Sequence, residues 1–135
     1  MCIFVRSKKR KAMKHVFLFA FSLAFLSCNS VKIAERIFGS ELFAHWVHAH
    51  EEDGSDHRVF RRADYAFPPS RGREGFEIKS DGSFVHHQIG PVDAPVIVNG
   101  TWKMQGEDIL RISPETGEAW TIQILEVNKD MLKVK

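Results

Sequence analysis

The chain has 135 residues, of which 44% are hydrophobic, with 19 basic residues, 17 acidic residues and two cysteines. Six of the basic residues and none of the acidic ones precede Cys28, so the rest of the chain has 13 basic and 17 acidic residues, a net charge of −4 with neutral histidines. This acidic remainder argues against a nucleic-acid partner, and its length fits one small domain.

A basic segment followed by an apolar one lies near the N-terminus. Residues 8–14 carry five positive charges, and residues 16–26 are apolar apart from one serine. This pattern is typical of a secretory signal, and the apolar run is too short to span a bilayer comfortably. We therefore expect residues 1–27 to be a cleaved signal peptide. Met13 is itself a normal start for such a signal, which would make residues 1–12 an upstream extension.

The sequence Phe25-Leu26-Ser27-Cys28 resembles the lipobox of bacterial lipoproteins. The resemblance implies cleavage before Cys28, a diacylglycerol on its sulfur and an acyl chain such as palmitate on its new amino group. Two or more acyl chains anchor a protein stably, because each buried methylene contributes about 0.8 kcal/mol. Asn29 favours, by the same resemblance, the outer membrane, with the protein facing the periplasm or the cell surface. The alternative is an ordinary signal peptide that leaves Cys28 free.

Residues 28–40 are expected to form a lipid-anchored tether or a short helix. Ile33, Ile37 and Phe38 lie at helical spacing, and Gly39 is a suitable helix end.

From Glu41 onward, short apolar segments alternate with polar turns, starting with residues 42–50. The clearest pattern is a hairpin in which residues 76–79 and 84–89 flank the turn Ser80-Asp81-Gly82-Ser83. Further strands are expected over residues 96–104, 110–112, 120–127 and 132–134. The alternation breaks near the end of 120–127, which indicates a bulge there.

Short strands with turns every 8–12 residues or so indicate an all-β fold. Residues 41–135 are therefore expected to form an antiparallel meander that closes into a small barrel or a curled sheet. Trp46, the turn at residues 80–83, Gly100-Thr101-Trp102 and Leu132-Lys133-Val134 resemble small bacterial lipocalin-like lipoproteins. The resemblance implies an up-and-down barrel or curled sheet around an apolar interior.

Histidines and carboxylates are concentrated in one segment. His48 and His50 would share a face if they lay on one strand, and Asp53 and His57 follow them in the polar turn. Imidazole and carboxylate groups suit Zn²⁺ or Cu²⁺, and His86 or His87 could add a ligand from a neighbouring strand. The alternative is a solvated polar edge held by ordinary salt bridges.

Two further groups are candidates for ligand contact. Arg71 and Arg73 could hold a carboxylate or phosphate by bidentate hydrogen bonds, or pair with nearby acids. Trp46, Trp102 and Trp120 could line a ligand pocket or fill the core.

The sequence contains no nucleophile elbow, P-loop or dinucleotide-binding motif, so we expect a protein without catalytic activity or a resident cofactor. Three functions remain open for a lipid-anchored envelope protein. It could bind a small apolar or amphipathic ligand, which needs a cavity of about 300 Å³ or more. It could bind Zn²⁺ or Cu²⁺, or present a surface to another envelope protein.

Overall fold

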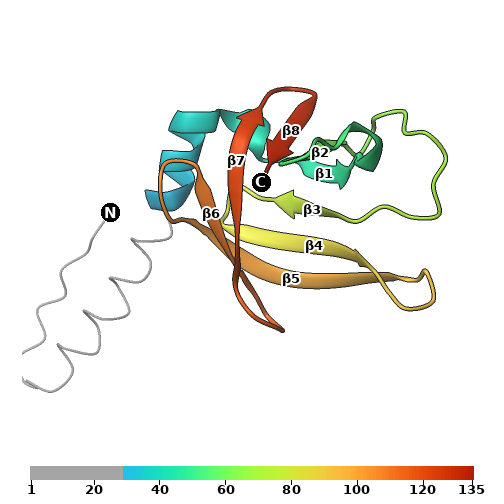
Figure 1. The fold of residues 1–135 in the computed structure, drawn as a ribbon. Coiled ribbons are helices and arrows are strands. Elements are labelled where there is room, and N and C mark those ends of the chain that lie inside the picture. Colours follow the sequence, from blue (N-terminus) through green and yellow to red (C-terminus); the bar gives the residue numbers. More distant parts are fainter. Residues whose placement is uncertain (1–28) are drawn as a thin grey trace, which may run out of the picture.

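The computed structural model describes residues 29–135, so the signal-peptide and Cys28 predictions lie outside the described residues. Eight antiparallel strands form a closed barrel, which confirms the predicted all-β fold (Figure 1). The strands are β1 (His45–His48), β2 (Arg58–Arg62), β3 (Gly75–Ile78), β4 (Ser83–Ile89), β5 (Pro95–Met104), β6 (Ile109–Pro114), β7 (Trp120–Val127) and β8 (Met131–Val134).

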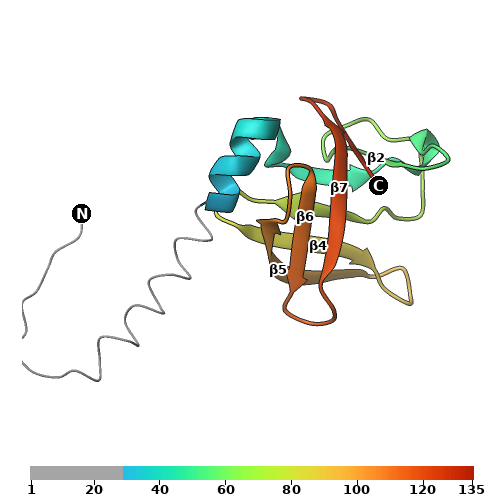
Figure 2. The same ribbon diagram turned by 60° about the vertical axis from the view of Figure 1, so that its left-hand side comes forward.

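Strands β3 to β8 form the predicted meander, in which each strand pairs with the next one in the chain. Figure 2 shows β6 and β7 side by side on one wall of the barrel. The order changes at the N-terminal side, because β1 pairs with both β2 and β3, and β2 pairs with β8. Strand β1 therefore lies between β2 and β3, whereas a purely up-and-down barrel would pair β2 with β3. Residues 63–74 connect β2 to β3 past the intervening strand β1.

The predicted hairpin and bulge are both present. Ile78 of β3 pairs with Phe84 of β4, and Gly82 has a φ of 89° in the turn between them. The ladder of β7 with β8 shifts register between Ile124 and Glu126, at the end of the expected strand. Alternation, turn glycines and a break in parity therefore predict local strand structure well.

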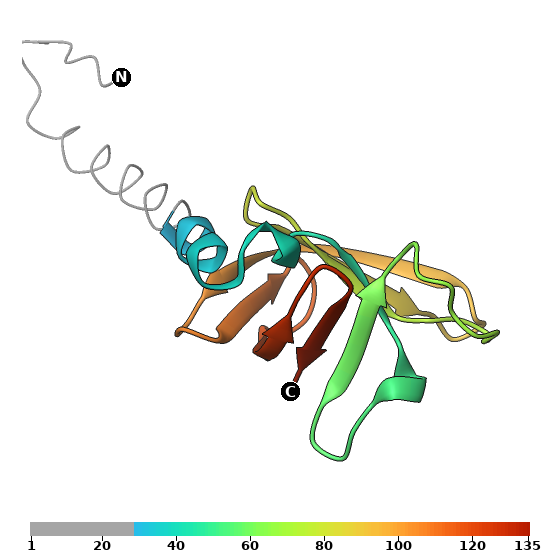
Figure 3. The ribbon, with the colours of Figure 1, turned by 90° about the horizontal axis from the view of Figure 1, so that it is seen from above.

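One end of the barrel is closed by a helix, of which the structure describes residues 29–38, and by η1 (Ser40–Leu42). The helix ends at Gly39, whose φ of 74° few other residues adopt. Ala34 and Leu42 are fully buried against the strands, whereas Ile33 is exposed. This helix and the tip of the β4–β5 hairpin lie at opposite ends of the barrel (Figures 1 and 3). Within residues 29–135, no helix is both long and apolar enough to cross a membrane.

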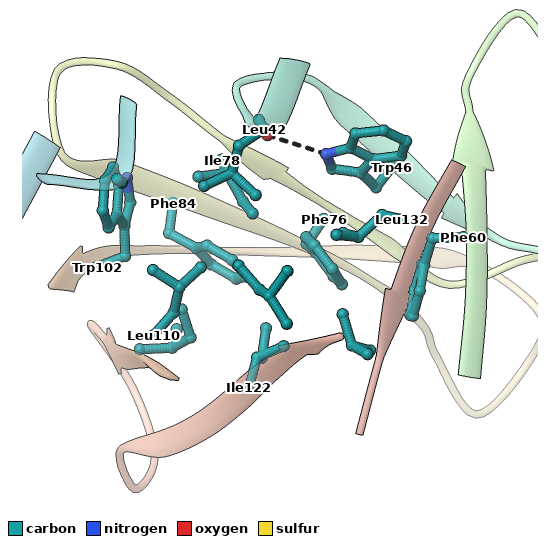
Figure 4. Close-up of a cluster of buried hydrophobic side chains, with 14 residues drawn as sticks. Leu42, Trp46, Phe60, Phe76, Ile78, Phe84, Trp102, Leu110, Ile122 and Leu132 are labelled. Atoms are coloured by element: carbon teal, nitrogen blue, oxygen red, sulfur yellow. Dashed lines mark hydrogen bonds between the residues drawn. The ribbon is translucent and has the colours of Figure 1, made fainter. Parts of the chain in front are cut away.

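The core lies next to the closed end. Figure 4 shows Trp46, Trp102 and aliphatic side chains converging from several strands. The indole Nε1 of Trp46 donates a hydrogen bond of 3.0 Å to the Leu42 carbonyl, and that of Trp102 donates one of 2.9 Å to the Lys79 carbonyl. Both buried indoles therefore have a partner for their polar atom.

Candidate functional site

The end of the barrel opposite the helix is open. It contains a cavity of about 460 Å³ that begins where the packed core stops. Side chains on the inner face of five strands line its walls, and polar residues lie around its edge. The lining residues on which the argument depends are Arg58, Phe60, Glu74, Phe76, His86, Trp120, Ile122 and Val134.

The floor of this cavity is apolar and aromatic. The rings of Phe60 and Phe76 lie 4.8 Å apart between centroids, and both side chains are almost fully buried. Trp120 is partly exposed, and its ring centre lies 5.5 Å from that of His86. An apolar group that entered the cavity would therefore meet ring faces, which favour burial of hydrocarbon.

The rim of the cavity is polar and hydrogen-bonded. The guanidinium of Arg58 pairs with the Glu74 carboxylate and approaches Nδ1 of His48 at 3.2 Å. Nε2 of His48 lies 2.9 Å from Oδ2 of Asp53, and the backbone amide of Val59 donates a hydrogen bond to Oδ1 of the same carboxylate. The chain of contacts holds Arg58 at the opening, where 49% of its side chain remains exposed.

His86 stands on the same rim, on β4. Burial lowers the pKa of His86, although the nearby Glu74 carboxylate acts in the opposite direction. Its Nδ1 lies 3.0 Å from the side-chain amide of Gln88. The lowered pKa favours the uncharged imidazole, which can act as a hydrogen-bonding group at the rim.

The four predicted metal ligands do not converge on one point. The expectation that His48 and His50 share a strand face is wrong, because β1 ends at His48 and His50 begins η2 (His50–Glu52). His48 contacts Asp53 at 2.9 Å, whereas His57 pairs with its neighbour Asp56, also at 2.9 Å. These contacts match the other interpretation of this segment, in which histidines and carboxylates form ordinary salt bridges on a solvated polar edge.

A different group of histidines does come together, on the outer face of the barrel. His45, Glu77 and His87 offer ligand atoms that all lie within 4.8 Å of one another. Burial and the neighbouring His87 lower the pKa of His45, while Glu77 raises it. Sequence reasoning missed this group because its members come from β1, β3 and β4, and only the strand register brings them together.

The two predicted anion-binding arginines have different surroundings. Arg73 pairs with Glu51 and donates to the carbonyls of Pro68 and His48 at 2.9 and 3.1 Å. Only 9% of its side chain is exposed, so Arg73 fastens the 63–74 connection to η2. The hydrogen bond from Arg73 lowers the pKa of Glu51 to about 2. Arg71 is exposed, and its anion binding stays a prediction.

Two of the three tryptophans that could line a ligand pocket lie in the core. Trp46 and Trp102 are 0% and 2% exposed, and neither is among the residues that line the open cavity. Trp120, the third tryptophan of that prediction, does line the cavity, together with Ile122. No sequence pattern pointed to Arg58 and Glu74 as cavity residues, because they are 16 positions apart and only the fold pairs them.

The β4–β5 hairpin carries exposed apolar side chains beyond the cavity. Ile89, Val92, Val96 and Ile97 are between 40% and 83% exposed. An exposed apolar surface is what binding to another envelope protein would require, and that function stays a prediction.

No protein-family model, curated protein or solved structure matches this chain. The fold itself is consistent with the lipocalin-like resemblance, because eight antiparallel strands close into a barrel around an apolar core with one open end.

Proposed function

We propose that this protein is a lipid-anchored, non-catalytic envelope protein that binds a small amphipathic molecule in the open end of its barrel. The observation that supports the proposal most directly is the cavity of about 460 Å³, which exceeds the minimum expected of a binding site. Its location also suits this role, because mouths of small β-barrels are common ligand sites.

The chemistry of the cavity favours a ligand with an apolar body and an acidic head group. Phe60, Phe76 and Trp120 offer a surface for hydrocarbon. Arg58 stands at the rim with about half of its side chain exposed, and a guanidinium has enough N–H donors to contact a ligand carboxylate as well as Glu74. A ligand placed in this way would bury its chain and leave its charge near water.

Decanoate tests this arrangement directly. The protein is expected to bind one decanoate in a saturable manner, with a change in the emission of Trp120. Replacement of Arg58 by glutamine is expected to weaken binding by about tenfold or more, because a charge-assisted hydrogen bond is lost. Isothermal titration calorimetry measures the affinity.

Two controls make the result specific. Arg111→Gln removes an equal charge from an exposed position on β6 and should leave decanoate affinity unchanged. Decanol has the same chain without the carboxylate, so Arg58→Gln should not affect its binding. The proposal fails if decanoate shows no saturable binding, or if Arg58→Gln and Arg111→Gln have equal effects.

The membrane anchor is a separate part of the proposal and is supported by the basic leader, the apolar run and the lipobox-like sequence. In a bacterium that processes lipoproteins, the protein is expected in the membrane fraction, cleaved before Cys28 and increased in mass by its acyl chains. Cys28→Ser should remove both the added mass and the membrane association. Mass spectrometry that finds an intact, unacylated chain in the cytosol would refute the anchor.

A further inference from the structure

His45, Glu77 and His87 meet on the outer wall of the barrel, away from the open cavity. We propose that these three side chains bind a divalent transition-metal ion, and that Zn²⁺ suits them best. The proposed metal site is independent of ligand binding in the cavity, because these three residues do not line that cavity.

The strand register places the three side chains together. His45 of β1 pairs directly with Glu77 of β3, so both point outward on adjacent strands. Glu77 pairs with Val85 of β4, which puts His87 at the diagonal position on the same face. The site is thus carried by three paired strands and not by a loop, which keeps the ligand backbones fixed.

The side-chain distances are close to those that a metal ion requires. Nδ1 of His45 lies 3.9 Å from one oxygen of Glu77, and Nε2 of His87 lies 3.4 Å from the other. Two ligands on a tetrahedral zinc ion, each bound at about 2.0–2.1 Å, are separated by about 3.3 Å. Small rotations of side chains that are about one-third exposed would close the remaining gap.

Gly75 leaves room for this arrangement. It pairs with Val47 on one side and with His87 on the other, and it has no side chain on the outer face. The imidazole of His87 therefore reaches across β3 and stacks on that of His45, with ring centres 4.5 Å apart. The ligand atoms that the two imidazoles and the carboxylate offer all lie within 4.8 Å of one another.

The donor set indicates the kind of ion. Two imidazoles and one carboxylate suit Zn²⁺, whereas Mg²⁺ and Ca²⁺ prefer oxygen ligands. The side chains of His45, Glu77 and His87 are 35%, 30% and 28% exposed, which leaves a path for the ion and space for a water ligand. By contrast, the positive charge of Arg58 next to His48 disfavours a cation at the segment that the sequence had suggested.

A Zn²⁺ titration of the full chain tests the site, with the thiols blocked by iodoacetamide and a chromophoric chelator as competitor. One Zn²⁺ is expected to bind with high affinity. His45→Asn with His87→Asn should weaken that binding by at least about tenfold, the effect of losing roughly 1.4 kcal/mol. Nuclear magnetic resonance should show the imidazole signals of His45 and His87 shifting with zinc.

The matched control is His48→Asn with His50→Asn, which removes the same number of histidines and should retain the parent affinity. Glu77→Gln preserves side-chain shape and should also weaken binding, so it serves if the double variant at His45 and His87 does not fold. Circular dichroism checks the fold of each variant. Unchanged zinc affinity in folded Glu77→Gln or in the His45/His87 variant, or loss of binding only in the His48/His50 control, overturns the proposal.

Discussion

Replacement of Gly75 by alanine is expected to destabilise the barrel by about 3 kcal/mol, near the upper end of the usual range for overpacking. A Cβ at this position would lie 2.3 Å from the carbonyl oxygen of Trp46 and 3.1 Å from the Cα of Val47. Both obstacles are backbone atoms, so no rotation of a side chain relieves the clash. Strand β1 would have to move away from β3, and hydrogen bonds that close the barrel would lengthen.

Urea unfolding monitored by far-UV circular dichroism measures the loss. Gly106→Ala is the matched control, because no heavy atom lies within 4 Å of the Cβ that it would add. This control should change the free energy of unfolding by less than about 0.5 kcal/mol. Equal stability of the Gly75→Ala and Gly106→Ala variants would show that β1 does not approach β3 as described.

Trp46→Ala is expected to cost about 3–5 kcal/mol, the usual effect of truncating a large buried aromatic residue. Trp46 is 0% exposed, and its loss would leave a cavity next to Leu42 and remove the hydrogen bond to the Leu42 carbonyl. The guanidinium of Arg62, whose centre lies 5.1 Å from the Trp46 ring, would lose that contact as well. The free energy of unfolding of a small domain is only about 5–15 kcal/mol, so this variant would lose a large part of its stability.

Trp120→Ala provides the comparison for this variant. Trp120 is partly exposed at the open end, and its truncation widens a cavity that already reaches solvent. The midpoint of urea unfolding should therefore fall much less for Trp120→Ala than for Trp46→Ala. Similar midpoints for the two variants would contradict the division of the barrel into a packed end and an open end.

Local structure was predictable from the sequence where neighbours in the chain decide it. The hairpin around Gly82 follows from alternating apolar residues and a residue that favours positive φ. The break in alternation after Ile124 indicated the bulge between β7 and β8. The first strand was expected over residues 42–50 and is shorter, since 3-10 turns flank His45–His48. Histidine and alanine around Trp46 give alternation too weak to locate those ends.

The sites depend on long-range pairing, and this is why the sequence located them poorly. Insertion of β1 between β2 and β3 joins His45 to Glu77, and no local pattern encodes that order of strands. The open end was not predictable either, since Trp102 and Trp120 both lie on inward-facing positions of alternating strands. The helix that includes residues 29–38 adds Ala34 to the core at the closed end, and no strand pattern indicates which end it covers.

The position of that helix has a consequence for access to the cavity. The described residues of this helix start at Asn29, next to the proposed point of acylation, and the helix covers the filled end of the barrel (Figure 1). A bilayer attachment at this point would hold the filled end toward the lipid and direct the opening to the aqueous side. Cargo would then be exchanged with water or with another soluble carrier, and direct uptake from the supporting membrane would require the whole barrel to turn over.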